Sequence, residues 1–126
     1  MSEAKKKILV VDDEPDIVNM LKMRLEASGY EVIIAGDGNT AYNKAKSDSP
    51  DLIILDLMLP NMDGYQVCGL LKKDTRYAKI PIIIFTARAQ KSDQDLGFEV
   101  GANAYITKPF EAKELLEKIK SLLGGQ

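Results

Sequence analysis

Five short apolar runs, rich in β-branched residues, recur along the chain with helix-like segments between them. We predict that the five runs are strands at Ile8–Val11, Val32–Ala35, Leu52–Leu55, Ile82–Phe85 and Ala104–Thr107. Strict alternation of strand and helix indicates parallel pairing through right-handed crossovers. Because the strands are apolar almost throughout, helices must cover both of their faces. The predicted fold class is therefore α/β, a doubly wound five-stranded parallel sheet.

Apolar residues at helical spacing mark three of the intervening segments. The stripes are Ile17, Met20, Leu21 and Leu25; Val67, Leu70 and Leu71; and Leu115, Ile119, Leu122 and Leu123. Segments 41–45 and 93–100 carry a shorter pattern of the same kind. Pro15 suits a first helical turn, Gly29 suits the position after a helix, and Gly64 follows an aspartate that can open one.

Length and charge limit the classes of protein that the chain can belong to. With 126 residues, 45% of them hydrophobic, we expect one domain spanning 1–126 and no output domain. A net charge of -2 argues against a nucleic-acid binder or a protein held on a membrane surface by positive charge. We interpret the lysines at 5–7 as part of a solvated N-terminal tail.

The chain has one cysteine, Cys68, and no histidine. A disulfide framework is thereby excluded, and so are the usual base for a serine or cysteine nucleophile and the commonest zinc ligand. No apolar run approaches the roughly 20 residues of a membrane span. We therefore expect no membrane insertion and a cytoplasmic location.

Polar residues follow four of the predicted strands, where ligands bind in open α/β sheets. They are Asp12 and Asp13 after the first, Asp56 after the third, Thr86 after the fourth and Lys108 after the fifth. Each has an ordinary alternative role: a helix cap for either of the first two, a turn for Asp56, a strand residue for Thr86, and an exposed lysine. Together these roles do not explain why chemically related groups gather at one edge.

Clustered carboxylates repel one another unless a hard cation is present, and oxygen ligands favour Mg²⁺, Mn²⁺ or Ca²⁺. Phosphoryl transfer needs a nucleophile, positioning and neutralisation of the phosphoryl oxygens. A carboxylate, a cation, a lysine and a hydroxyl supply these parts, so the edge is predicted to carry out phosphoryl transfer.

The combined motif closely resembles the receiver domains of bacterial two-component response regulators, the CheY-like family. The matching residues are Asp12-Asp13, Asp56 with Pro60 and Asp63-Gly64, Thr86-Ala87, and Lys108-Pro109-Phe110. The resemblance covers essentially the whole chain in order and spacing. It implies a flavodoxin-like strand order 2-1-3-4-5 and a phosphorylation-activated signalling switch rather than a conventional enzyme.

By this resemblance, Asp56 accepts a phosphoryl group from a phospho-histidine of a sensor histidine kinase or a histidine phosphotransfer protein. The reaction would depend on Mg²⁺ and would be catalysed by the domain itself, as would slow dephosphorylation. Asp13 would bind the ion directly and Asp12 mainly through water. Asp56 and the backbone carbonyl of Met58 would be further ligands.

The resemblance also implies that Lys108, before a cis peptide bond to Pro109, pairs with one phosphoryl oxygen. Thr86 would donate its hydroxyl to another oxygen and move inward. Tyr105 is either the switch aromatic coupled to Thr86 or a plain packing residue. The surface of the fourth helix, fifth strand and fifth helix would then contact an unknown protein target, or a second copy in a phosphorylated dimer, without direct contact to nucleic acid.

Two long side chains, Met58 and Arg88, occupy positions that flank the path of water to the phosphoryl group in this family. Neither can orient a water as a carboxylate would, which predicts slow loss of the phosphoryl group. The alternative is that both side chains point into solvent and change nothing.

Three rival functions remain. Gly36, Gly38 and Ala41 match a dinucleotide-binding pattern with Asp56 as its acid, but that function leaves the other residues of the edge without a role. An aspartate-nucleophile phosphatase usually carries a second acid two residues after the nucleophile, where this chain has Met58. A pure docking module would lack the acceptor or the lysine.

Overall fold

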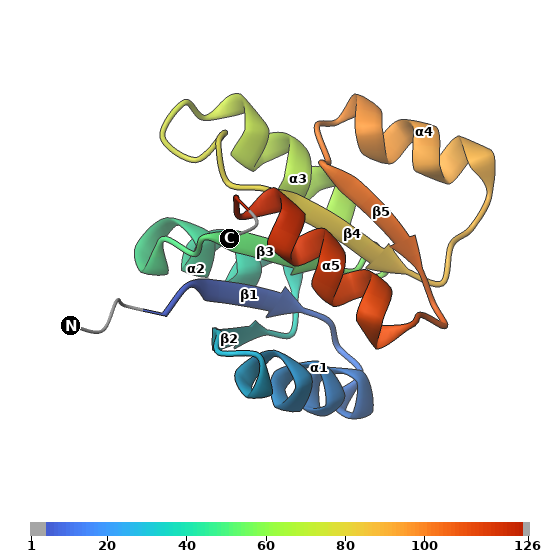
Figure 1. Cartoon of the computed structure of the whole chain (residues 1–126). Helices are drawn as coiled ribbons and strands as arrows, with labels where there is room; N and C mark the ends of the chain where they lie inside the picture. Colours follow the sequence, from blue (N-terminus) through green and yellow to red (C-terminus); the bar gives the residue numbers. More distant parts are fainter. Residues whose placement is uncertain (1–4, 125–126) are drawn as a thin grey trace.

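The computed structural model describes residues 5–124, which form a five-stranded sheet with helices on both faces (Figure 1). The strands are β1 Lys7–Val11, β2 Glu31–Ala35, β3 Leu52–Leu55, β4 Ile82–Thr86 and β5 Ala104–Thr107. All pairs are parallel and the order is β2-β1-β3-β4-β5. The predicted fold class and strand order are confirmed.

Helices join the strands in strict alternation. They are α1 Pro15–Ala27, α2 Gly38–Asp48, α3 Gly64–Lys73, α4 Lys91–Glu99 and α5 Ala112–Leu122. No helix within residues 5–124 is long and apolar enough to cross a membrane.

The sheet separates two hydrophobic cores because successive residues of a strand point to opposite faces. Ile8 packs with α1 and α5 on one face, whereas Leu9 packs with α2 and α3 on the other. Strands β1, β3 and β4 are almost fully buried, as expected for strands covered on both sides. This burial explains why the positions of the strands could be predicted from the sequence.

Predicted and observed elements differ at some strand ends and in the buried faces of the helices. Strands β1 and β2 start one residue earlier, and β4 ends one residue later, at Thr86. In α3 the predicted stripe was partly wrong: Val67 and Leu71 are buried, but Leu70 is 42% exposed and Cys68 is buried instead. The buried face is spaced by three and four residues from Gly64 onward, which leaves Leu70 at its margin.

Individual residues of the sequence mark where α1 and α3 begin and where α1 ends. Pro15 stands in the first turn of α1, and Asp63 forms a capping box with Gln66 at the start of α3. Gly29, after α1, has a φ of 94°, which favours glycine.

Close packing explains why residue 38, which belongs to the dinucleotide-like pattern, is a glycine. Its N–H donates to the Pro60 carbonyl over 3.3 Å, and a Cβ at this position would overlap the Met62 carbonyl oxygen. The loop after β3 thus lies directly on the first turn of α2. The glycine at position 38 therefore has a packing role in this fold.

Candidate functional site

Three carboxylates meet where β1 and β3 end. The two strands are neighbours, with Val11 paired to Leu55, so the residues that follow them lie side by side. Oxygens of Asp12, Asp13 and Asp56 lie within 4.8 Å of one another. Asp12 and Asp56 are buried, whereas Asp13 is exposed. The predicted acidic cluster is therefore brought together, and its oxygen donors suit a hard divalent cation.

Lys108 reaches this cluster from the end of β5. Its Nζ lies 2.7 Å from Asp12 Oδ2, 3.3 Å from Asp56 Oδ2 and 3.2 Å from Glu14 Oε1. Burial alone would lower the pKa of Lys108, but the hydrogen bond to Asp12 and the charges of Asp56 and Asp12 outweigh it and raise that pKa. The ammonium stays charged and faces three anions. The Lys108–Pro109 peptide bond is cis, as the resemblance implies.

Asp12 is hydrogen-bonded both to Lys108 and to the backbone at the start of α1. Its Oδ1 accepts from the backbone N–H of Glu14 over 2.9 Å, which ties the entry of α1 to the cluster. The N-cap of α1 is Glu14 rather than either aspartate, and its side chain caps nothing. Burial raises the pKa of Asp12, although its hydrogen bond to Lys108 opposes that shift. A bound cation would favour the charged form.

Thr86, Arg88 and Tyr105 form one connected group. Thr86 is fully buried, and its Oγ1 accepts from the Arg88 N–H over 3.4 Å. Tyr105 donates its hydroxyl to the Arg88 carbonyl over 2.7 Å. Burial raises the pKa of Tyr105 to about 12. The hydroxyl of Tyr105 thus links β5 to the loop that follows Thr86.

Met58 and Arg88 have different contacts in this structure. Met58 donates its N–H to Asp56 Oδ1 over 3.2 Å, and the residue is 60% exposed. The Nε of Arg88 lies 3.5 Å from Asp93 Oδ1, so the guanidinium faces the first turn of α4. Of these two residues, Met58 hydrogen-bonds to Asp56, whereas Arg88 pairs with Asp93.

Sequence reasoning did not single out Glu14 or Tyr65. Glu14 adjoins the aspartate pair, so its place at the same edge was available as a signal. Tyr65 donates its hydroxyl to the Asp93 carbonyl over 3.0 Å, which links α3 to the start of α4. Nothing in its sequence neighbourhood indicated that contact.

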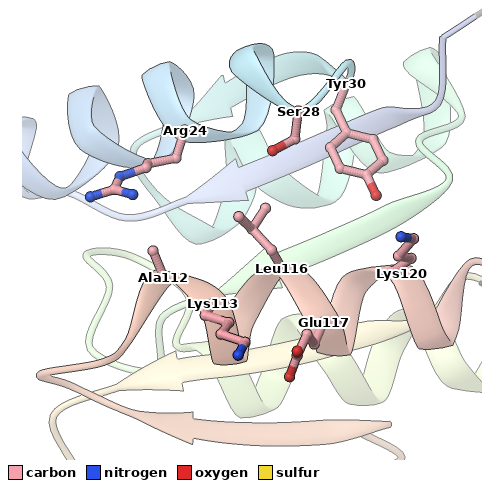
Figure 2. A pocket seen from close by; sticks show the side chains of 8 residues that line it. All are labelled: Arg24, Ser28, Tyr30, Ala112, Lys113, Leu116, Glu117 and Lys120. Atoms are coloured by element: carbon pink, nitrogen blue, oxygen red, sulfur yellow. The ribbon is translucent and has the colours of Figure 1, made fainter.

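A hollow of about 430 Å³ between α1 and α5 is separate from the acidic cluster (Figure 2). Tyr30 and Leu116 point into the space between the helices, and Arg24 and Lys120 lie toward its two ends. None of the acidic-cluster residues lines it. The predicted chemistry therefore belongs to the strand ends.

The fold and this site define a doubly wound α/β domain with an acidic cluster and a lysine at the carboxyl edge of its sheet. The chain belongs to the response regulator receiver domain family, whose model matches residues 8–120. Such domains are the phosphorylation-activated switches of two-component signalling. The resemblance inferred from the motifs is confirmed, and the rival functions receive no support.

Curated relatives are similar over nearly the whole chain. Identity is 48% over 118 residues to the alkaline phosphatase synthesis transcriptional regulatory protein PhoP of Bacillus subtilis (strain 168). It is 44% over 117 residues to the DNA-binding dual master transcriptional regulator RpaA of Synechocystis sp. (strain ATCC 27184 / PCC 6803 / Kazusa). The alignments cover 94% and 93% of this chain but 48% of each relative. The chain thus spans about half the length of the curated relatives it matches.

Solved structures agree with this assignment. A response regulator from Chloroflexus aurantiacus J-10-fl superposes with a TM-score of 0.92 at 36% identity, covering 96% of this chain and 99% of that one. The receiver domain of the sensor histidine kinase PA1611 from Pseudomonas aeruginosa PAO1 superposes with a TM-score of 0.89 at 31% identity, with the same coverage of both chains. That structure has a magnesium ion coordinated in its active-site cleft.

Proposed function

We propose that Asp56 is the phosphoryl acceptor and that the donor is a phospho-histidine of a sensor histidine kinase or a histidine phosphotransfer protein. One observation carries this proposal: the strand order puts Asp56 between the acids that follow β1 and the Thr86 and Lys108 side chains that follow β4 and β5. The 126 residues contain no histidine, so the donor imidazole must lie outside them.

In the proposed reaction a carboxylate oxygen of Asp56 forms a bond to phosphorus while the phosphorus–nitrogen bond of the phospho-histidine breaks. Lys108 donates to one phosphoryl oxygen and the Thr86 hydroxyl to another, which stabilises the charge on the transferred group. Mg²⁺ would neutralise phosphoryl charge when bound. Its ligands would be Asp13 directly, Asp12 mainly through water, Asp56 and the carbonyl of Met58.

The oxygen donors of the cluster support Mg²⁺ over soft metals. We expect weak Mg²⁺ binding in the resting protein and tighter binding with beryllofluoride, a phosphoryl mimic, together with shifts of the Thr86 and Tyr105 resonances. Asp13→Ala should weaken Mg²⁺ binding by about tenfold or more, because it removes a charged ligand. Titration followed by NMR measures both effects.

Asp16→Ala is the matched control, since Asp16 is exposed in the first turn of α1 and lies outside the cluster. Equal Mg²⁺ affinity in Asp13→Ala and the parent would contradict the ligand assignment.

We also propose how the switch reaches the surface. Movement of the Thr86 hydroxyl toward the phosphoryl group would disturb its contact with Arg88, whose carbonyl holds Tyr105. The surface of α4, β5 and α5 would then change (Figure 1). Phe98, 50% exposed and with its ring 6.5 Å from that of Tyr105, is an exposed apolar residue of this surface. A downstream protein or a second copy would bind there.

The lifetime of the phosphorylated state should depend on Met58 and Arg88. We expect slow decay, because neither side chain can orient a water for attack on phosphorus. For Arg88 this requires the guanidinium to leave Asp93 once the phosphoryl group is present. Met58→Asn combined with Arg88→Glu should accelerate decay about tenfold, measured as loss of label at neutral pH.

The two single variants separate the contributions of the two positions. Decay at the parent rate in the double variant would mean that both side chains stay in solvent.

A further inference from the structure

Lys108 has one partner that is not needed for the chemistry above. Its ammonium carries three hydrogens, and three carboxylates lie within 3.3 Å of it. Asp12 and Asp56 belong to the cluster that suits a cation, but Glu14 does not. Every hydrogen of the ammonium is therefore already directed to an anion before a phosphoryl group arrives.

A cation in the cluster affects these three partners unequally. It would neutralise Asp12 and Asp56, whose oxygens it shares, and so weaken their attraction for Lys108. Glu14 lies outside the cluster and keeps its full charge. Once the cation is present, Glu14 is the remaining strong competitor for the ammonium.

From this geometry we propose that Glu14 is a positioning residue. As a counter-ion it holds Lys108 away from the phosphoryl group, and it thereby lowers the affinity of the cation-loaded site for the phosphoryl group. This inference rests on the proposed phosphorylation of Asp56. Glu14 acts through Lys108, since its side chain makes no other hydrogen bond or ion pair with a residue of the site among residues 5–124. Its side chain is 62% exposed while that of Lys108 is 13% exposed, so the contact can open outward without exposing the core.

Glu14→Gln removes the charge and keeps the size of the side chain. We expect beryllofluoride to bind the Mg²⁺-loaded variant about two- to fivefold more tightly than the parent, the range for a partly exposed ion pair. Without beryllofluoride, Mg²⁺ should bind no more tightly than in the parent, because the released ammonium turns toward Asp12 and Asp56 and repels the cation. General damage to the site would weaken the binding of both ligands, so tighter binding of beryllofluoride without tighter binding of Mg²⁺ is diagnostic.

Glu111→Gln is the matched control. Glu111 is exposed on the loop that carries Lys108, and it makes no ion pair with that lysine in the described part of the chain. Its replacement removes the same charge from the same edge and should leave beryllofluoride affinity nearly unchanged. Equal tightening in both variants would overturn the proposal, since it would reflect net charge alone.

A double-mutant cycle tests the route of the effect. In a Lys108→Met background, Glu14→Gln should add no more than the Glu111→Gln control does. A persistent gain there, or parent affinity in the single variant, would overturn the proposal. If the parent itself fails to bind beryllofluoride with Mg²⁺, the proposed function fails instead, which keeps the two hypotheses separable.

Discussion

Asp56→Asn should abolish covalent labelling by a phospho-histidine donor, a loss of at least about 1,000-fold. The amide has almost the same size as the carboxylate but offers no anionic oxygen to attack phosphorus. Labelling with a radioactive phosphoryl group, followed by separation of the intact chain, measures the effect. The variant should remain folded, since the asparagine oxygen can still accept the hydrogen bond from the Met58 N–H.

Asp51→Asn is the control for Asp56→Asn. Asp51 precedes β3 at its opposite end, and its Oδ2 accepts from the Lys7 N–H. This control should be labelled as the parent is. Undiminished labelling of Asp56→Asn would place the acceptor elsewhere, with Asp12 and Asp13 as the remaining carboxylates of the cluster.

Gly64→Ala should destabilise the protein and distort the acceptor together. A Cβ at Gly64 would lie 2.5 Å from the Asp56 carbonyl oxygen and 2.8 Å from the Leu57 Cα, both backbone atoms that cannot turn aside. Overpacking of this kind costs about 1–3 kcal/mol or more. The first turn of α3 must move away from the end of β3, and Asp56 moves with it.

Gly69→Ala provides the matched comparison within the same helix. No atom lies within 4 Å of a Cβ at Gly69, so alanine should raise the free energy of unfolding by about 0.5–1 kcal/mol through helix propensity. Urea unfolding followed by circular dichroism measures both variants. A Gly64→Ala protein as stable as the parent would show that the contact between α3 and β3 yields easily.

The sequence predicted the fold because burial of the strands was nearly complete. The runs that contain Ile8, Leu52 and Ile83 are buried on both faces, and such runs leave little ambiguity about where a strand lies. Leu70 was misplaced because a stripe on a short helix is only a few residues wide, and its margin depends on which neighbouring element packs there.

The site was predictable in its members but not in its contacts. Asp12, Asp56 and Lys108 follow strands, and the parallel topology alone brings strand ends to one edge. The partnership of Lys108 with Glu14 depends on where a long flexible side chain reaches across from β5 to α1. The contact between Arg88 and Asp93 depends in the same way on side-chain conformation, which sequence spacing does not determine.

Helix α4 has fewer buried residues than any of the other four helices. Among its residues only Gly97 is buried, and Leu96 and Phe98 are 40% and 50% exposed. Two tyrosine hydroxyls, from Tyr65 and Tyr105, bind backbone carbonyls at and before its first turn. Few buried side chains therefore oppose a shift of α4, and we expect the loss of these two hydrogen bonds to favour such a shift.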